Sequence, residues 1–196
     1  MIRLMLASAS PRRKTIWTQV QLDFTIRASP IEEVLDNSLP IAKAIENIAV
    51  QKIAPIVEDF FNAMVVGCDT VVVKDGTVLK KPKDKQEAKQ MLKQLSNATH
   101  QVISGVAISY KGKMHQFSEI SEVCFYPLRD EDIDIYINSA EPFDKAGAYG
   151  IQGKGCIFVK SICGDYNNIV GFPMSRFLRE VEQVYGVNVM RNDEYF

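Results

Sequence analysis

The spacing of apolar residues at the start of the chain predicts a short strand followed by a helix. Residues 3–6 read as the strand. Ser10 is a favourable N-cap residue, and Pro11 is favourable at the first helical position, where its missing N–H needs no partner. The apolar stripe of this helix consists of Ile16, Trp17 and Val20. We therefore expect the chain to open as strand, loop and helix.

A second helix and a hairpin follow. The helix is expected to begin near Asn37, and Pro55 should end or kink it, because proline lacks the N–H of a helical hydrogen bond. Residues 63–73 are rich in β-branched side chains, which favour a strand. The turn residues 74–76, with Asp-Gly, predict a hairpin with residues 77–79.

The middle of the chain predicts one more helix and a second hairpin. Asp84 and Glu87 have the spacing of a capping pair, and the inner positions of the helix they open are Ala88, Met91, Leu92 and Leu95. Residues 102–110 and 117–125 then show the rough alternation of two strands joined by a tight turn.

The last third predicts short elements around a glycine-rich loop. A short helix with acidic residues at its start begins near Arg129, the loop covers residues 141–155, and a strand is expected over residues 156–162. Pro173 opens a last helix, whose inward residues are Phe177, Leu178, Val181 and Val184. The tail after Val189 is expected to be loose. Helices mixed with strands and hairpins indicate an α/β or α+β protein with a mixed sheet.

Composition narrows the class of protein. The chain has 196 residues, of which 46% are hydrophobic, and its 23 basic and 24 acidic residues give a formal charge of −1. This balance argues against disorder and against a protein that binds nucleic-acid backbone, which carries a basic excess. No apolar stretch reaches the roughly 18 residues of a membrane helix, and the N-terminus lacks the pattern of a signal sequence. We expect a cytoplasmic protein with no nucleic-acid or membrane partner.

The four cysteines do not form a recognisable metal or disulfide pattern. Cys68, Cys124, Cys156 and Cys163 include no CxxC pair. We interpret them as buried, reduced thiols, and expect neither a zinc site nor a disulfide framework.

Three charged features lie where apolar or acidic residues are normally found. Arg12 and Arg13 stand at a predicted helix start, where the N–H groups and the helix dipole favour anions. A phosphate held by these groups and by the hydroxyl of Ser8 or Ser10 would resolve the conflict; a pair of surface arginines is the alternative. Lys52 falls within the apolar stripe of the second helix, so it needs a partner or must reach the rim.

The third feature is Asp69, which lies between two valine-rich stretches. Its carboxylate requires a cation, a metal or hydrogen-bond donors if it is buried. Either a functional acid or an Asp that satisfies backbone donors fits the pattern, and Glu32 and Glu33 are candidate companions. Gly67 would allow a ligand to approach closely.

The glycine-rich loop is the remaining candidate for ligand binding. Its glycines would let the backbone wrap a ligand, and Gln152 offers a donor and an acceptor to a base edge. Its order is GxxGxG, which is neither the dinucleotide-binding fingerprint nor a P-loop. His100 and His115 are interpreted as polar strand positions, because no activated serine accompanies them.

Taken in order, seven segments resemble the Maf family of nucleoside triphosphate pyrophosphatases. They are LASASPRR, the Glu pair at 32 and 33, GCDTVVV, KKPKD, THQVISGVAI, EPFDKAGAYGIQG and GDYNNIVGFP. The resemblance covers nearly the whole chain and implies one domain over residues 1–196, with an inosine-triphosphatase-like α/β fold and two lobes around a central cleft. It also implies hydrolysis of nucleoside triphosphates to monophosphate and pyrophosphate, a divalent cation (Mg²⁺ or Mn²⁺) and a homodimer.

The resemblance also implies roles for individual residues. Asp69 corresponds to the family's catalytic acid and Glu33 to a second acid, and both would hold the metal. Lys52 and Lys81, with Ser8 and Arg13, correspond to the phosphate-handling set, and Lys145 is a further substrate-binding candidate. Arg12, Thr70 and Gln152 match positions that select substrate in the branch that prefers dTTP and UTP, whereas a sister branch acting on 7-methyl-GTP carries Gln in place of Thr70. Cys68 and Lys80 depart from the smaller residues usual at their positions.

These residues suit phosphoryl chemistry. Water attack on a triphosphate places negative charge on the phosphate oxygens, so positioned cations and a proton acceptor are the main requirements. A nucleotide-binding regulator of cell division that does not turn its ligand over is the alternative, and modified pyrimidine nucleotides are alternative substrates.

Overall fold

The computed structural model describes residues 2–29, 31–139, 141–191 and 193–194. The chain divides into two compact units. Unit 1 comprises residues 1–69, 104–119 and 171–196, and unit 2 comprises residues 70–103 and 120–170. No helix among the described residues is long and apolar enough to cross a membrane. A single Maf-like domain over residues 1–196 remains a prediction.

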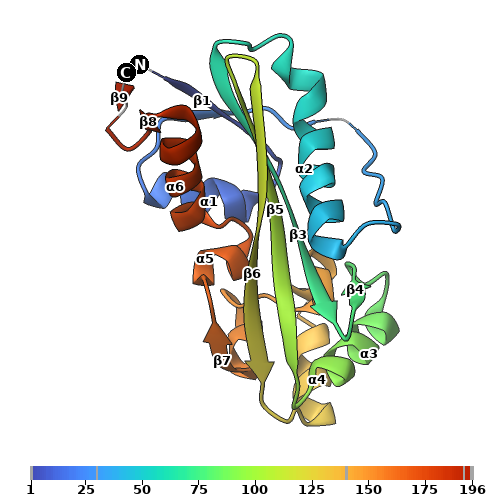
Figure 1. The fold of residues 1–196 in the computed structure, drawn as a ribbon. Coiled ribbons are helices and arrows are strands. Elements are labelled where there is room, and N and C mark those ends of the chain that lie inside the picture. The colour runs from blue at the N-terminus through green and yellow to red at the C-terminus, as the bar shows by residue number, and fades with distance from the viewer. Residues whose placement is uncertain (1, 30, 140, 192, 195–196) are drawn as a thin grey trace. The chain divides into compact units, whose positions relative to one another are not determined.

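Unit 1 combines parallel strands with three helices (Figure 1). Strand β1 pairs in parallel with β2 and with β3, in a register that places Leu4 opposite Phe24 and Met64. The elements that lie wholly in unit 1 are β1 (Arg3–Ala7), α1 (Pro11–Gln19), β2 (Phe24–Ile26), α2 (Ile41–Val57), α6 (Met174–Tyr185), β8 (Val187–Asn188) and β9 (Asp193–Glu194).

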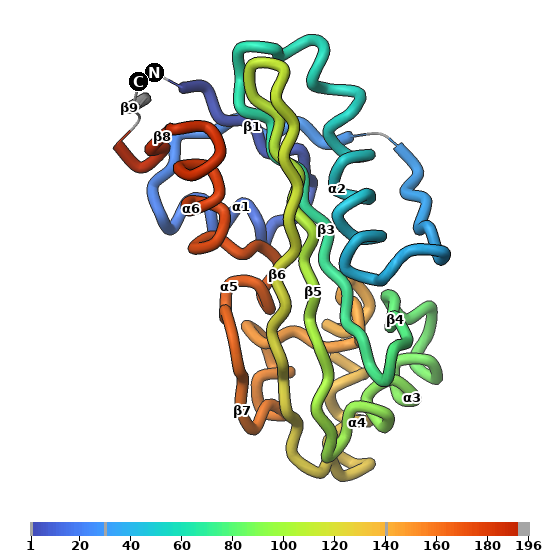
Figure 2. Tube along the Cα trace, in the orientation of Figure 1, coloured from blue at the N-terminus to red at the C-terminus, as the bar shows by residue number. Residues whose placement is uncertain are grey.

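Three long strands contribute residues to both units. They are β3 (Ala63–Lys74), β5 (Thr99–Tyr110) and β6 (Lys113–Phe125), and the strand order is β2-β1-β3-β5-β6-β7, with β4 paired to β3. Strands β5 and β6 are joined by a tight turn at Lys111 and Gly112 (Figure 2). The expected α/β class with a mixed sheet is confirmed, because parallel pairs at β1 accompany antiparallel pairs elsewhere.

Unit 2 joins antiparallel strands to short helices. Strand β4 pairs with β3, and β7 pairs with β6, both antiparallel. Asp84 caps α3 as expected, because its carboxylate accepts the Glu87 N–H at 2.8 Å. The remaining elements of unit 2 are β4 (Thr77–Leu79), α3 (Lys85–Leu95), α4 (Asp130–Ile137), the 3₁₀ helices η1 (Glu141–Asp144), η2 (Ala146–Ala148) and η3 (Lys154–Phe158), β7 (Val159–Cys163) and α5 (Tyr166–Val170).

Two glycines let α2 lie directly against the sheet of unit 1. A Cβ atom on Gly67 would lie 2.5 Å from the Ala49 carbonyl oxygen, and one on Gly105 would lie 2.5 Å from the Glu46 nitrogen. Any larger residue would therefore push the helix away from β3 and β5. The expectation that Gly67 makes room for a ligand is wrong, because the helix backbone fills that space.

The core of unit 2 contains several aromatic residues. Phe125, Tyr149 and Phe158 belong to it, together with the predicted inner face of α3. The buried His100 contacts the rings of Phe125 and Tyr149, and its Nε2 lies 2.8 Å from the Tyr149 hydroxyl oxygen. Burial lowers the pKa of His100 to about 4, so the ring is neutral. His100 lies on β5, as expected for a strand position, but its side chain is buried in the core of unit 2.

Several predicted boundaries differ from the structure. Helix α2 continues through Pro55 to Val57, and its first residue is Ile41. Strand β7 begins at Val159, since residues 154–158 form η3. The interpretation of the cysteines as buried thiols is wrong for three of the four: all are free, but only Cys68 is buried, and Cys156 and Cys163 are exposed. In the tail, β9 pairs with β8, while residues 192, 195 and 196 lie outside the described part of the chain.

Candidate active site

The start of α1 holds Arg13 in a buried position. Its Nε donates to the Gly171 carbonyl at 2.9 Å, and a terminal nitrogen donates to the Ser8 hydroxyl oxygen at 3.2 Å. That hydroxyl oxygen also accepts the Ser10 N–H at 3.2 Å. The first turn of α1 contains no acidic residue. Since Arg13 is only 8% exposed, the alternative of a surface arginine pair is wrong for Arg13, and Arg12 is half-buried.

Lys52 carries the second positive charge, and it lies between two carboxylates. Its position on α2 places it on the buried face, where it is 9% exposed. The ammonium Nζ lies 2.6 Å from Asp69 Oδ1 and 3.0 Å from Glu33 Oε1, and it donates to the Cys68 carbonyl at 3.3 Å. The anomaly in the apolar stripe is therefore resolved by pairing, as a buried ammonium requires.

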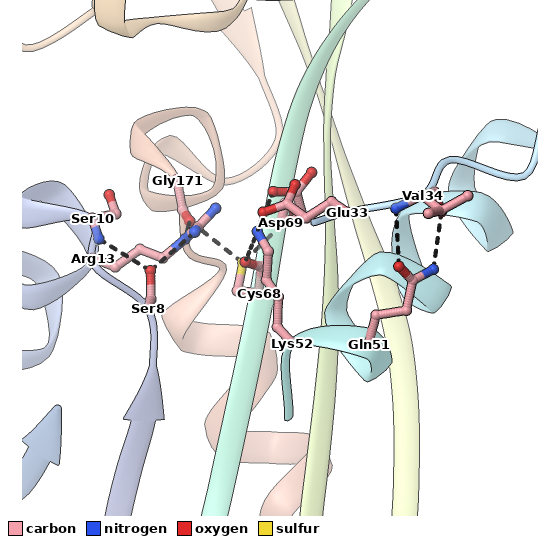
Figure 3. Close-up of polar contacts among 10 residues, drawn as sticks. All are labelled: Ser8, Ser10, Arg13, Glu33, Val34, Gln51, Lys52, Cys68, Asp69 and Gly171. Atoms are coloured by element: carbon pink, nitrogen blue, oxygen red, sulfur yellow. Dashed lines mark hydrogen bonds and ion pairs between the residues drawn. The ribbon is translucent and has the colours of Figure 1, made fainter. Parts of the chain in front are cut away.

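The two groups of charges are connected through the backbone around Cys68. The Cys68 thiol donates to the Gly171 carbonyl at 3.5 Å, the same oxygen that accepts from Arg13. Figure 3 shows the resulting continuous chain of contacts from Ser8 to Asp69. Five of the predicted site residues are thus brought together within unit 1, and they are Ser8, Arg13, Glu33, Lys52 and Asp69.

Gln51 is a residue of this site that the sequence did not indicate. Its side-chain oxygen accepts the Val34 N–H at 3.0 Å, and its side-chain nitrogen donates to the Val34 carbonyl at 2.9 Å (Figure 3). Both polar groups of one amide therefore hold the residue that follows Glu33. This pair of bonds attaches the Glu33 segment to α2 beside Lys52. The only sequence signal was a glutamine next to the anomalous lysine, which is too common to interpret alone.

The donor set suits a divalent cation shared with a ligand. Asp69 and Glu33 converge on one positive charge, the Lys52 ammonium. Among the residues that the structure describes, no group of three or more His, Cys, Asp or Glu side chains could hold a metal ion. Two carboxylates without a third protein ligand match Mg²⁺, which is usually held by one or two carboxylates with substrate phosphates and water completing the shell. These residues therefore fit the expected cation only as a partner of a phosphate ligand.

Arg12 also lies in unit 1, and the remaining predicted site residues lie in unit 2. Thr70 follows Asp69 directly on β3 and is half-buried, while Lys81 and Gln152 are exposed. The Lys145 ammonium donates to the Glu141 carbonyl at 3.0 Å and pairs with Asp144 at 2.6 Å. The glycines around Gln152 pack against the carboxylate of Glu141. The loop therefore wraps a side chain of this protein, where the sequence led us to expect a ligand.

Comparison with known proteins shows close relatives over almost the whole chain. A protein of Bacillus mycoides named dTTP/UTP pyrophosphatase is 45% identical over 183 residues, which are 93% of this chain and 96% of the relative. A protein of Halalkalibacterium halodurans with the same name is 44% identical over 91% of this chain and 94% of the relative.

Solved structures give a weaker likeness. A dITP/XTP pyrophosphatase from Mycobacterium abscessus is 14% identical, with a TM-score of 0.46 over 93% of this chain and 98% of that one. The Ham1 protein of Staphylococcus aureus has a TM-score of 0.45 at 11% identity, over 63% of this chain and 71% of that one.

The family assignment rests on a match to the chain as a whole. The profile of the family described as Maf-like protein matches residues 3–184. This span includes every predicted site residue in both units. Together with relatives at 45% identity, it shows that the chain belongs to the Maf family.

Proposed function

We propose that this protein hydrolyses dTTP and UTP to the nucleoside monophosphate and pyrophosphate. The relatives at 44% and 45% identity carry that activity in their names. The observation that carries the proposal is the pairing of the buried Lys52 with Asp69 and Glu33, in one network with Arg13. Apolar residues would pack in these positions as well as the charged residues do, so packing alone does not account for the cluster of opposite charges.

A triphosphate would find positive charge at two places in unit 1. The N–H groups at the start of α1 and the Arg13 guanidinium lie within one turn of each other, and such helix starts bind phosphate. The Lys52 ammonium provides the second charge. Because lysine is a flexible point charge, Lys52 can exchange a carboxylate partner for a phosphate oxygen without a change in the backbone.

Asp69 is the proposed proton acceptor. Once the Lys52 ammonium turns toward phosphate, the Asp69 carboxylate is released to accept a proton from water. The water oxygen then forms a bond to the α-phosphorus, the bond from that phosphorus to the bridging oxygen breaks, and pyrophosphate leaves. Lys52 and Arg13 stabilise the charge that develops on the phosphate oxygens. Mg²⁺ or Mn²⁺, held by Asp69 and Glu33, would supply further neutralisation of the triphosphate.

We assign recognition of the remaining substrate groups to unit 2 and to Arg12. Lys81 and Lys145 provide ammonium groups for the phosphates. Thr70 and Gln152 have the donors and acceptors that match the N3–H and carbonyl edge of uracil or thymine. Modified pyrimidines with the same edge are alternative substrates. A homodimer in the cytoplasm is also part of this proposal, and light scattering of the purified protein tests the dimer.

Product analysis tests the proposed activity. The protein is incubated with each of dTTP, UTP, dCTP, dATP and GTP in the presence of Mg²⁺ or Mn²⁺, and pyrophosphate and monophosphate are measured. We expect both products in equal amounts, fastest from dTTP and UTP. Release of inorganic phosphate without pyrophosphate would refute cleavage at the α-phosphorus. Nucleotide binding without any product would favour the alternative of a non-hydrolytic regulator.

A further inference from the structure

The glycine-rich loop of unit 2 is built around one carboxylate, that of Glu141. Glu141 Oε2 accepts the Lys154 N–H at 2.9 Å. Oε1 accepts the Tyr136 hydroxyl at 3.0 Å and the Gly155 N–H at 3.3 Å. Two backbone N–H groups and one hydroxyl therefore hold the same side chain, and both backbone groups belong to the loop.

The glycines of the loop allow this carboxylate to come close. A Cβ atom on Gly153 would lie 2.5 Å from Glu141 Cδ, so a larger residue there would displace the carboxylate. A Cβ atom on Gly155 would lie 2.8 Å from the Gly150 carbonyl oxygen. The space beside the three glycines of the GxxGxG pattern is thus occupied by the Lys145 side chain at Gly150, by Glu141 at Gly153 and by the loop backbone at Gly155.

Tyr136 attaches the other end of the loop to the same carboxylate. Its hydroxyl donates to Glu141 Oε1 and accepts the Gly150 N–H at 3.2 Å. Burial, together with the nearby Glu141 charge, raises the pKa of Tyr136 above its usual range, so the hydroxyl remains a donor at neutral pH. Glu141 is therefore bonded directly at residues 154 and 155, and through Tyr136 at residue 150.

Gln152 lies between these two points of attachment. Its side chain is exposed, while Gly150 before it and Lys154 after it have their N–H groups fixed by the network. The five-residue span from Gly150 to Lys154 has both ends held, so it has little freedom, because its conformational entropy has already been lost. The position of the Gln152 side chain therefore depends on Glu141, which lies eleven positions earlier in the chain.

We propose that Glu141 is a positioning residue for pyrimidine selection, which it controls by holding residues 150–155 in the shape that presents Gln152. Glu141 touches no substrate in this scheme and acts through the loop. The inference rests on the proposed function for its effect on substrate choice. Its structural half is the claim that the shape of the loop depends on the Glu141 carboxylate. This claim can be tested whether or not the protein hydrolyses nucleotides.

The first measurement is hydrogen exchange of the loop amides. Glu141→Gln replaces one accepting oxygen by an NH₂ group, which cannot accept an N–H, and so leaves Lys154 or Gly155 without its bond. We expect exchange at Lys154 or Gly155, whichever loses its acceptor, to be at least about tenfold faster than in the wild type, the effect of roughly one lost hydrogen bond. Asp130→Asn, which removes an exposed ion pair with Lys93 in the same unit, is the matched control and should leave these rates unchanged. Unchanged exchange in Glu141→Gln would refute the structural half.

The second measurement is a double-mutant cycle with Gln152→Ala. The readout is the ratio of kcat/KM for dTTP to kcat/KM for dCTP. We expect Glu141→Gln and Gln152→Ala each to lower this ratio by about tenfold, and the double variant to lower it no further, because both act through the same amide. Multiplicative effects, or an equal loss for both nucleotides, would refute the positioning role.

A second variant and the activity of the wild type separate the possible causes of a negative result. If Glu141→Gln does not fold, Tyr136→Phe removes a single hydroxyl of the network and should produce the same two changes in weaker form. If the wild type makes no pyrophosphate from any nucleotide, the proposed function fails, while the exchange measurement still judges the role of Glu141 in the loop. If the wild type is active and Glu141→Gln keeps the dTTP to dCTP ratio, the proposed function stands and this inference fails.

Discussion

Both units pair carboxylates with hydrogen-bond donors, but the donors differ in kind. In unit 1, Asp69 and Glu33 share the ammonium of Lys52, a side chain with four rotatable bonds. In unit 2, Glu141 is bonded to backbone N–H groups and a buried tyrosine. The first arrangement can change partners, whereas the second cannot change without moving the backbone.

The two kinds of pairing differ in how easily a ligand could replace them. The side chain of Glu33 is 45% exposed and that of Asp69 is 17% exposed, so Glu33 has the weaker hold on Lys52. An arriving phosphate can therefore displace Glu33 first. In unit 2 the bonds to Glu141 and Tyr136 hold the loop without any ligand, and such preorganisation suits recognition of a rigid base.

The largest expected effect comes from Asp69→Asn. The amide keeps the shape of the carboxylate but accepts no proton from water, so we expect pyrophosphate release from dTTP to be abolished while nucleotide binding is mostly retained. Single-turnover product formation and binding by calorimetry measure the two quantities. Hydrolysis near the wild-type rate would show that Asp69 takes no part in the reaction. The contrast between the carboxylates of the two units would then have no bearing on catalysis.

Lys52→Ala and Lys81→Ala come next. A single preorganised charge in such a site contributes about 10²-fold or more to kcat, and we expect losses of that order for both variants. Lys52→Ala also leaves Asp69 and Glu33 with no ammonium between them, so its half-saturating Mg²⁺ concentration should fall, whereas that of Lys81→Ala should not. Steady-state kinetics at varied Mg²⁺ give both numbers. Unchanged kinetics in both variants would mean that the lysines lie outside the reaction.

Gln51→Leu should have a smaller effect that is limited to Glu33. Without the two bonds to Val34, the Glu33 segment is no longer attached to α2. We expect a several-fold higher half-saturating Mg²⁺ concentration with a smaller change in kcat, since Asp69 keeps its place. Gln90→Leu makes the same replacement at an exposed position of α3 and serves as the control. Equal behaviour of the two variants would contradict the role of Gln51.

The smallest expected effect is the pH dependence contributed by His100 in unit 2. Its pKa is about 4 in the folded protein and about 6.5 when unfolded, so between these values the unfolded state binds the extra proton. The contribution of His100 to the free energy of unfolding is therefore fully present above pH 6.5. It falls as the pH is lowered toward 4, by at most about 1.4 kcal/mol per pH unit for one proton. Urea unfolding of the wild type and of His100→Gln at pH 7 and 5 checks this. The variant should lose less stability than the wild type over that interval; an equal loss would exclude His100 as the source.

Sequence reasoning succeeded where the physical cause was local. The cap of Asp84 on Glu87 spans three residues, and the burial of Lys52 follows from helical periodicity. Reasoning failed where the partner is distant, as with Arg13 and the Gly171 carbonyl, 158 positions apart. Backbone oxygens carry no sequence signal, and neither does the pairing of Gln51 with Val34. The glycines were recognised as places of close approach, but only the fold shows that α2 and Glu141 occupy the space.

The packing of α2 against Gly67 and Gly105 also has an evolutionary consequence. Lys52 reaches Asp69 only because a helix and a sheet meet without intervening side chains. A single added methyl group at Gly67, two positions from Asp69, would change the reach of Lys52 toward that carboxylate. Natural variation should therefore be as restricted at these two glycines as at the charged residues they bring together.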